Sequence, residues 1–365
     1  MLNFVVRIVA VATILGACVV VTMRANDSTT IVLDPWGAVG FYSSGYSASK
    51  GESPWYDLSN SAPRGGVGLN ILTLGITAES SGLFGSAAVQ LGDIPSSGWD
   101  VDLHWLQEAW LGYHLSELFD VSAGAFISPI GIETVNSFEN YSGIMSIPSF
   151  FDPACHSGVQ LTWNAAADVA VTGGVVSSFS SFMLSTAVPS VLLGMEYTPG
   201  EDAHLVQLLV SREESDTGEY DQVYASASST THFESTHLLA ELNLIYGIPT
   251  DGSAPSAMFS GLLAAYVDLA PFWQAGLRLE GVHDPSGIFS YARYASPLPE
   301  NVLSAAGLSA TIAYMPTQWS KIRLDARYIG CLDSRSVVEA SPPVQERTEI
   351  VLCADVQLSF LRREE

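Results

Sequence analysis

The sequence is poor in charged residues, and poorest in basic ones. Charged side chains make up 14% of the 365 residues, against roughly 25% in an average soluble domain. Only 14 Lys and Arg stand against 38 Asp and Glu, so the formal net charge is −24. Proteins that bind nucleic acids need basic patches to neutralise phosphates. The composition therefore excludes a nucleic-acid partner and argues against a cytosolic nucleotide enzyme.

A long internal apolar run is also missing. A helix that spans a membrane needs about 18 or more consecutive apolar residues, and no such run occurs beyond the N-terminus. Nevertheless, 48% of the residues are apolar. Because membrane strands carry an apolar residue at every second position, an apolar chain without helical spans indicates a membrane β-barrel.

Catalytic motifs are absent as well. No glycine-rich segment is followed by the Lys-Ser/Thr pair of a phosphate loop, and no segment has the pattern around a nucleophilic serine. We therefore expect no enzyme activity, no catalytic residues and no cofactor. A barrel hydrolase whose serine and histidine converge only in the fold stays open as an alternative.

Residues 1–25 are predicted to be a signal peptide that is removed on export. Arg7 precedes an apolar stretch from Ile8 to Val21, and a polar start follows it, which is the order of an export signal. Cleavage after Ala25 would leave a small residue at the cut. Two alternatives stay open: a lipoprotein-like box that would place a lipid on Cys18, and an uncleaved anchor helix, for which the apolar run is short.

Cysteines are few, and their spacing is not that of a metal site. Beyond Cys18 the chain has Cys155, Cys331 and Cys353, an odd number without zinc-like spacing. Cys331 and Cys353 fall on neighbouring predicted strands, but Cys353 lies several residues deeper than the expected hairpin partner of Cys331. The sequence therefore predicts no metal and leaves this disulfide open.

Short segments with period-two alternation recur through the mature chain, 26–365, and no segment has helical periodicity. The clearest segment, 350–360, has one apolar face and ends at an aromatic residue. Segments 321–329 and 273–280 alternate apolar residues with charged or polar ones. Since charges on a membrane strand must point away from lipid, these charged residues are expected to face the lumen.

Sixteen strands are expected, with centres near residues 38, 72, 88, 108, 124, 160, 173, 194, 207, 225, 241, 264, 277, 311, 325 and 355. The weakest candidate is 223–227, and without it and a partner the number falls to fourteen. The mature chain then has roughly 21 residues per strand and connection, enough for spans of about 9–11 residues. The predicted fold is an all-β, transmembrane, antiparallel up-and-down barrel of about sixteen strands.

The connections alternate between tight turns and long loops, as in outer-membrane barrels. The long loops are expected at 44–63, 130–154, 178–189, 211–221, 282–303 and 331–348. Aromatic residues near the segment ends are expected to form the two girdles at the membrane interfaces: Trp36, Tyr42, Trp105, Tyr113, Trp163, Tyr197, Tyr246, Trp273, Tyr314 and Tyr328.

Two sets of charged residues are candidates for the lumen. The loop at 130–154 carries Glu133, Glu139 and Asp152, and it either folds inward as a constriction or packs on the rim. The late strands carry Arg278, Glu280, Lys321, Arg323, Asp325 and Arg327. A basic wall opposite an acidic loop would create a transverse field that filters solutes, whereas local pairing would only brace the wall. Both interpretations stay open.

A third set surrounds the strand centred near residue 108. Asp102, His104 and Glu108, with His114 beyond them, could suggest a metal or acid–base site. On the expected strand they alternate with apolar residues. The sequence therefore favours a polar row that lines the pore over a metal site.

Two stretches of the sequence resemble a known family. One contains GAFISPIGIE at 124–133, ENYS at 139–142 and FDPACHSGV at 151–159, and the other is LRLEGVHDPSG at 277–287. In their order and separation they are similar to the signature of the outer-membrane β-barrel porins of the OmpL-like group. The resemblance implies a porin-like role without catalytic residues. The chain departs from many such barrels by continuing with LRREE beyond Phe360.

We therefore expect an outer-membrane porin, a water-filled channel for passive diffusion of small hydrophilic solutes. The excess of acidic over basic residues predicts a preference for cations, because rings of acidic residues select cations in other pores. The expected partners are outer-membrane lipid, small solutes or ions, and further copies of the chain in a homo-oligomer. The alternatives are a plugged structural or adhesive surface barrel that binds partners through its external loops, and a secreted soluble β-sandwich.

Overall fold

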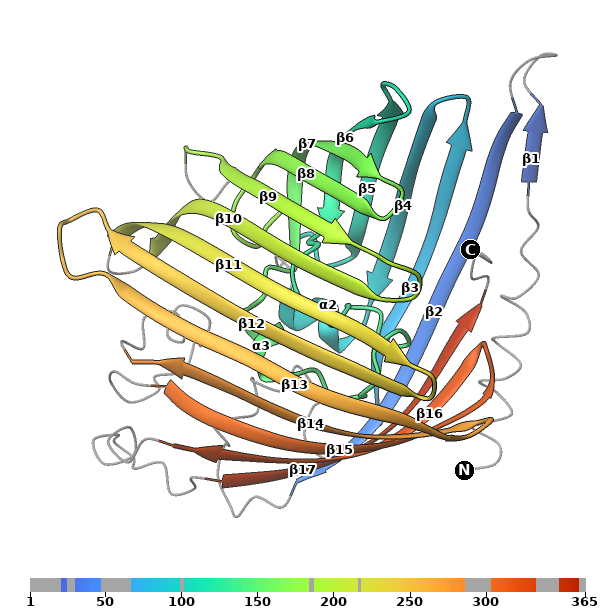
Figure 1. The fold of residues 1–365 in the computed structure, drawn as a ribbon, viewed down its shortest axis with the longest axis vertical. Helices are drawn as coiled ribbons and strands as arrows, with labels where there is room; N and C mark the ends of the chain where they lie inside the picture. Colours follow the sequence, from blue (N-terminus) through green and yellow to red (C-terminus); the bar gives the residue numbers. More distant parts are fainter. Residues whose placement is uncertain are drawn as a thin grey trace.

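The computed structural model describes residues 21–24, 30–46, 67–98, 102–183, 187–215, 218–285, 303–332 and 348–360. Within these residues, strands β2 to β17 form one closed antiparallel barrel (Figure 1). Each strand pairs with the next along the chain, and β17 closes the ring against β2, with Phe360 opposite Gly37. This confirms the predicted all-β, up-and-down barrel and excludes the β-sandwich.

The barrel strands are β2 (Thr30–Tyr46), β3 (Val67–Ser80), β4 (Leu83–Leu91), β5 (Leu106–His114), β6 (Phe119–Ile127), β7 (Cys155–Ala166), β8 (Val169–Val176), β9 (Ser190–Tyr197), β10 (Ala203–Ser215), β11 (Gly218–Phe233), β12 (Thr236–Pro249), β13 (Ser256–Ala270), β14 (Trp273–Asp284), β15 (Leu303–Thr317), β16 (Ser320–Cys331) and β17 (Thr348–Phe360). All sixteen predicted centres fall within these strands. The alternative of fourteen strands is wrong, because β11 is one of the longest strands described.

One predicted loop is a hairpin instead. Residues 211–215 continue β10 and residues 218–221 begin β11, and the two stay paired as far as Ser215 opposite Gly218. Arg212 and Asp221 are direct cross-strand partners and form an ion pair with 2.8 Å between Nε and Oδ1. Polar residues interrupt the apolar alternation in this segment, which is why the sequence predicted a loop. The two strands nevertheless stay paired beyond the lipid-facing zone, because strand pairing does not depend on contact with lipid.

A short strand, β1 (Val21–Arg24), pairs with the first residues of β2 (Figure 1). It lies inside the range predicted as a signal peptide. The rest of that range up to residue 20, including Cys18, is outside the described residues. The side chain of Cys331 is also outside them, whereas Cys353 is a buried free cysteine.

The outer face of the barrel is apolar. Leu242, Leu277 and Leu324 are 73%, 60% and 60% exposed in the isolated chain, and their neighbours along each strand point inward and are buried. The period-two alternation therefore separates a lipid-facing surface from a lumen-facing one, as predicted. No helix in the described part of the chain is long and apolar enough to cross a membrane.

Aromatic residues ring the barrel near the tight turns. Tyr113, Trp163, Tyr197 and Trp273 are exposed on the outer face at strand ends. Trp163 stacks on Phe119 of the paired strand at 6.5 Å between ring centroids. These positions match one of the predicted girdles, where amphipathic rings lie at the level of lipid headgroups.

Most residues of the β6–β7 connection lie inside the barrel. This connection, residues 128–154, is called the inward loop below, and it includes helix α3 (Ile147–Phe151). Another short helix, α2 (Asp93–Gly98), follows β4. The inward loop packs against a row of apolar residues on the inner wall, in which Leu192, Leu209, Tyr224, Ile245 and Met258 are successive cross-strand partners.

Candidate functional site

The inward loop is bonded to widely separated strands of the wall. On one side, Asn70 of β3 donates to Ser137 at 2.9 Å, and Gln107 of β5 donates to Asn136 at 3.2 Å. On another, Gln207 of β10 donates to the carbonyl of Pro129 at 2.6 Å. Because these strands lie in different sectors of the ring, the loop crosses the lumen and narrows it.

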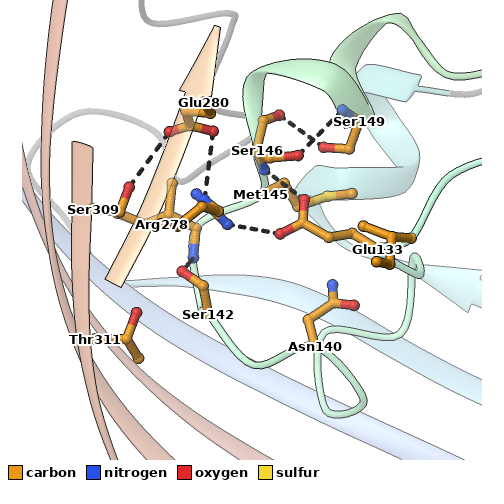
Figure 2. A network of polar contacts seen from close by, with 12 residues as sticks. Glu133, Asn140, Ser142, Met145, Ser146, Ser149, Arg278, Glu280, Ser309 and Thr311 are labelled. Atoms are coloured by element: carbon orange, nitrogen blue, oxygen red, sulfur yellow. Dashed lines mark hydrogen bonds and ion pairs between the residues drawn. The ribbon is translucent and has the colours of Figure 1, made fainter. Parts of the chain in front are cut away.

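An alternating charged cluster joins the loop to β14 and β16. Figure 2 shows its members from the loop and β14, Glu133, Arg278 and Glu280. Arg278 Nη1 lies 2.7 Å from Glu133 Oε1 of the loop. Glu280 lies between two guanidinium groups, 3.5 Å from Arg278 Nε and 2.7 Å from Arg327 Nε. The oxygen that faces Arg278, Oε2, also accepts a hydrogen bond from the Ile147 amide of α3 at 2.8 Å.

The remaining basic residues of β16 bind carbonyl oxygens of the loop. Lys321 donates to the carbonyls of Phe138 and Asn140 at 2.7 and 3.1 Å. Arg323 donates to Asn140 and Ser142 at 2.5 and 3.0 Å, while its other nitrogens bind the carboxylate of Asp355 on β17. This strand therefore holds the loop mainly through main-chain atoms.

Asp325, which lies between Arg323 and Arg327 on β16, accepts hydrogen bonds from the loop. Ser142 Oγ and the Gly143 amide donate to it at 2.8 and 3.1 Å. A Cβ at position 143 would lie 2.7 Å from an oxygen of Asp325. Glycine is therefore needed at this position, because no side chain would fit between loop and wall.

Two buried carboxyl groups meet where the loop returns to the wall. Asp152 accepts hydrogen bonds from the Tyr224 hydroxyl of β11 and from Asn243 Nδ2 of β12. Asn243 also donates to Glu241, whose other oxygen accepts from the Ile132 amide at 2.9 Å. The start and the end of the loop are thus fixed at neighbouring wall positions.

Tyr141 of the inward loop packs against aromatic residues of the wall. Its ring stacks on Tyr266 at 4.7 Å between centroids, and its hydroxyl lies 3.4 Å from His232 Nε2. Burial, and then the nearby Asp268 carboxylate, raise the pKa of Tyr141 to about 12. The phenol is therefore neutral at physiological pH.

Most of the predicted lumen residues contact the inward loop or belong to it. Arg278, Glu280, Arg323, Asp325 and Arg327 are all buried, because the loop covers them. Each of them bonds to the loop, and Glu280 also pairs with Arg278 and Arg327. Glu133 and Asp152 of the loop share in this network, whereas Glu139 is exposed at its tip.

The third predicted set is not a row along one strand. Asp102 and His104 lie in the turn before β5, not on the strand as predicted. Glu108 lies on β5, where it accepts hydrogen bonds from Ser86 and Trp110 at 2.5 and 3.1 Å. His114 is at the far end of β5 and contacts Asp120 at 2.6 Å. No group of three metal-ligating side chains occurs among the described residues.

The wall that the loop leaves uncovered is formed by the parts of β5 to β8 near their tight turns. Polar inner-face residues of these strands remain partly exposed: Glu108, Asp120, Ser122, Gln160, Thr162, Asn164 and Thr172. This sector has no basic side chain, because no Lys or Arg occurs between Arg64 and Arg212. Water along this sector therefore meets polar and acidic side chains, while Arg278, Arg323 and Arg327 are buried under the loop.

Sequence reasoning missed the apolar inner row and the polar residues Tyr224, Glu241 and Asn243. A signal for the row exists on β13, where both faces carry apolar residues: Met258, Leu262 and Tyr266 point inward, and Phe259 and Leu263 point outward. A strand that is apolar on both faces must be covered on both. Here lipid would cover one face, and the inward loop covers the other.

Comparison with known proteins places the chain among porins. Residues 34–360 match the model of the family described as "Putative beta-barrel porin-2, OmpL-like". None of the curated proteins compared with the chain matches it in sequence.

Three solved structures with the same fold are distant in sequence. OmpT of Vibrio cholerae has 11% identity and a TM-score of 0.60, covering 93% of this chain and 100% of its own. An anion-selective porin from Comamonas acidovorans has 11% identity and a TM-score of 0.58, with 91% and 99% covered. OmpF of Salmonella typhi, in complex with daunomycin, has 10% identity and a TM-score of 0.61, with 92% and 99% covered. At these identities the likeness concerns the fold.

Proposed function

Because the chain belongs to the OmpL-like β-barrel porin family, we propose that it forms a water-filled channel for passive diffusion of small hydrophilic solutes across the outer membrane. The observation that carries this proposal is the division of the barrel interior. The inward loop covers the wall from β10 to β17, and the polar inner face of β5 to β8 stays partly exposed. A path for solutes would run between this face and the loop.

We further propose that the channel prefers cations. The proposed path has acidic residues, among them Glu108 and Asp120, and no Lys or Arg on the strands that line it. The guanidinium groups of Arg278, Arg323 and Arg327 are engaged with carboxylates or carbonyls of the inward loop and neighbouring strands. An ion on the path would therefore meet a negative potential, which favours cations.

A plugged surface barrel is the second candidate, and the contacts of the inward loop on opposite sides of the lumen favour it. In that case the external loops would act as binding surfaces. The chain would be exported by its predicted signal peptide in either case. A homo-oligomer is a further proposal, which draws support from the trimer form of the structurally similar OmpT.

Planar-bilayer recordings of the refolded protein decide between these functions. A channel gives discrete conductance steps, and a salt gradient across the bilayer then gives a reversal potential whose sign identifies the preferred ion. We expect steps with cation preference. An absence of steps would favour the plugged barrel, and anion-selective steps would refute the charge argument alone.

A further inference from the structure

A row of aromatic side chains runs along the inner face of β4, β5 and β6. In order from the tight turns toward the inward loop, its members are His114, Phe84, Trp110 and Phe126. Neighbouring rings are in contact along the whole row, with 4.4, 5.8 and 6.2 Å between successive centroids. This set is called the aromatic row below. It borders the proposed path, which runs along β5 to β8.

The two central rings of the row are accessible and fixed in place. Phe84 and Trp110 are partly exposed, whereas Phe126 is buried at the end near the inward loop. The Trp110 indole donates to Glu108 Oε2 at 3.1 Å, and Glu108 also accepts a hydrogen bond from Ser86 at 2.5 Å. These bonds hold the indole in one orientation. A ligand that covers such rings gains hydrophobic free energy without having to order them first.

Uncharged polar side chains lie beside the aromatic row. Phe84 is opposite Gly112 of β5, and Gly112, Ser122 of β6 and Gln160 of β7 are successive cross-strand partners. The Phe84 ring lies over Gly112, where a Cβ would collide with it. Within the described part of the chain, neither the Ser122 hydroxyl nor the Gln160 amide group has a hydrogen-bond partner. Both groups are therefore available to a ligand that lies against the Phe84 ring.

This combination fits an uncharged sugar. A pyranose ring has apolar faces of C–H groups and a rim of hydroxyl groups that both donate and accept hydrogen bonds. The negative face of an aromatic ring attracts C–H groups, and amide and hydroxyl side chains pair with sugar hydroxyls. A cation is also attracted to aromatic faces. However, the carboxylates of this wall, Glu108 and Asp120, are already bonded to protein groups, and the groups without a partner are neutral.

We propose that the aromatic row binds uncharged pyranose sugars. Phe84 and Trp110 stack against the faces of the sugar, and Ser122 and Gln160 form hydrogen bonds with its hydroxyl groups. Because several rings follow one another, a short oligosaccharide such as maltotriose should bind more tightly than a monosaccharide. The consequence for transport rests on the proposed channel function, since bound sugars would enter the path more readily than open-chain polyols. Binding itself does not require an open channel.

Saturation-transfer NMR tests the site on the full-length protein, refolded in a detergent without a sugar headgroup. Methyl β-glucopyranoside and sorbitol are probes of similar size, and only the glucoside has a ring with apolar faces. Saturation of aromatic protein protons should reach the C–H protons of the glucoside, which should bind about fivefold more tightly than sorbitol. Equal affinities would overturn the proposal. Tighter binding of phenyltrimethylammonium than of the glucoside would show a cation site instead and would also overturn it.

Variants assign the stacking and the hydrogen bonds. Trp110→Leu, which removes the ring but keeps an apolar side chain, is expected to lower the affinity for maltotriose about fivefold, and Trp110→Phe should retain most of it. Gln160→Met, which leaves the row intact, is also expected to lower the affinity about fivefold. Trp163→Leu on the outer face and Gln318→Met in the exposed β15–β16 turn are the matched controls. Unchanged affinity in Trp110→Leu or in Gln160→Met would overturn the proposed arrangement.

Planar-bilayer recording separates this site from the channel function. Maltotriose that blocks the ion current, with a block about fivefold weaker in Trp110→Leu, supports both. Conductance steps without maltotriose binding would overturn the sugar site and leave the channel intact. Maltotriose binding without any conductance would overturn the channel and leave the binding site intact.

Discussion

Arg278 on β14 and Glu133 in the inward loop form an ion pair across the barrel interior, with 2.7 Å between Nη1 and Oε1, although 145 positions separate them in the sequence. Both side chains are buried, at 2% and 8% exposure. Removing one partner of a buried pair costs about 3–5 kcal/mol, because the other charge is left uncompensated. This pair therefore couples the position of the loop to the wall.

Glu133→Ala is expected to release part of the inward loop without unfolding the barrel, whose strand pairing does not involve this residue. The free energy that holds the loop would fall by about 3–5 kcal/mol. Single-channel recording should show a larger and noisier conductance, and limited proteolysis should cut within residues 128–154. Glu201→Ala, which removes an exposed carboxylate in the β9–β10 turn, is the matched control. A variant with unchanged conductance and no new cleavage would contradict the coupling.

Tyr224→Phe tests the other anchor of the loop. It removes the hydroxyl that donates to Asp152 and is expected to cost about 1–3 kcal/mol, because a buried carboxyl group loses a donor. Hydrogen exchange should accelerate at the amides of α3 and of residue 152. Tyr246→Phe, on the outer face, should leave these amides unchanged. Equal exchange in the two variants would show that the hydroxyl contributes nothing.

The barrel could be predicted because lipid imposes a simple rule on each strand. Segments 321–329 and 350–360 carry apolar residues at alternate positions, and each such segment is a strand of the barrel. Apolar alternation does not predict strands in the parts of the barrel that lie outside the lipid. The hairpin around Ser215 lies beyond the apolar zone, and its polar residues gave no sign that the strands continue.

The site could be predicted only in part, because alternation shows that a side chain points inward but not what it meets there. Arg278, Arg323 and Asp325 point inward as expected, but the loop buries them. Their partners are often main-chain atoms, such as the Gly143 amide and the Asn140 carbonyl. Every residue has main-chain atoms, so no pattern of side chains in the sequence predicts such contacts.

A charge on the lipid-facing surface should destabilise the barrel according to its depth. Leu242→Arg, in the middle of β12, is expected to cost about 2–4 kcal/mol, because its side chain would lie near the bilayer centre. Phe233→Arg, beside the β11–β12 turn, should cost about 0–1 kcal/mol. Urea unfolding in lipid vesicles measures both. Equal costs at the two positions would contradict the proposed membrane placement.

Acidic residues of the proposed path should contribute to ion selectivity. Glu196 lies exposed near the end of β9, where it is paired with Ala170 of β8 and so borders the proposed path. A unit charge about 8 Å from an ion in water changes its energy by about 0.5 kcal/mol, roughly twofold in occupancy. Glu196→Gln should therefore lower the cation-to-anion permeability ratio roughly twofold, as read from the reversal potential. Glu214→Gln, on the outer β10–β11 hairpin, should have no effect, because salt screens distant charges. A larger effect for Glu214→Gln would place the path elsewhere.

In the proposed channel, water and ions pass between the inward loop and the inner face of β5 to β8. Thiol modification during bilayer recording tests it directly, with the native cysteines replaced. Ser122→Cys, on the partly exposed face of β6, should react with a charged methanethiosulfonate reagent and lose conductance. Ser226→Cys, buried on β11 between residues bonded to the loop, should not react. Block at position 226 without block at position 122 would contradict the account.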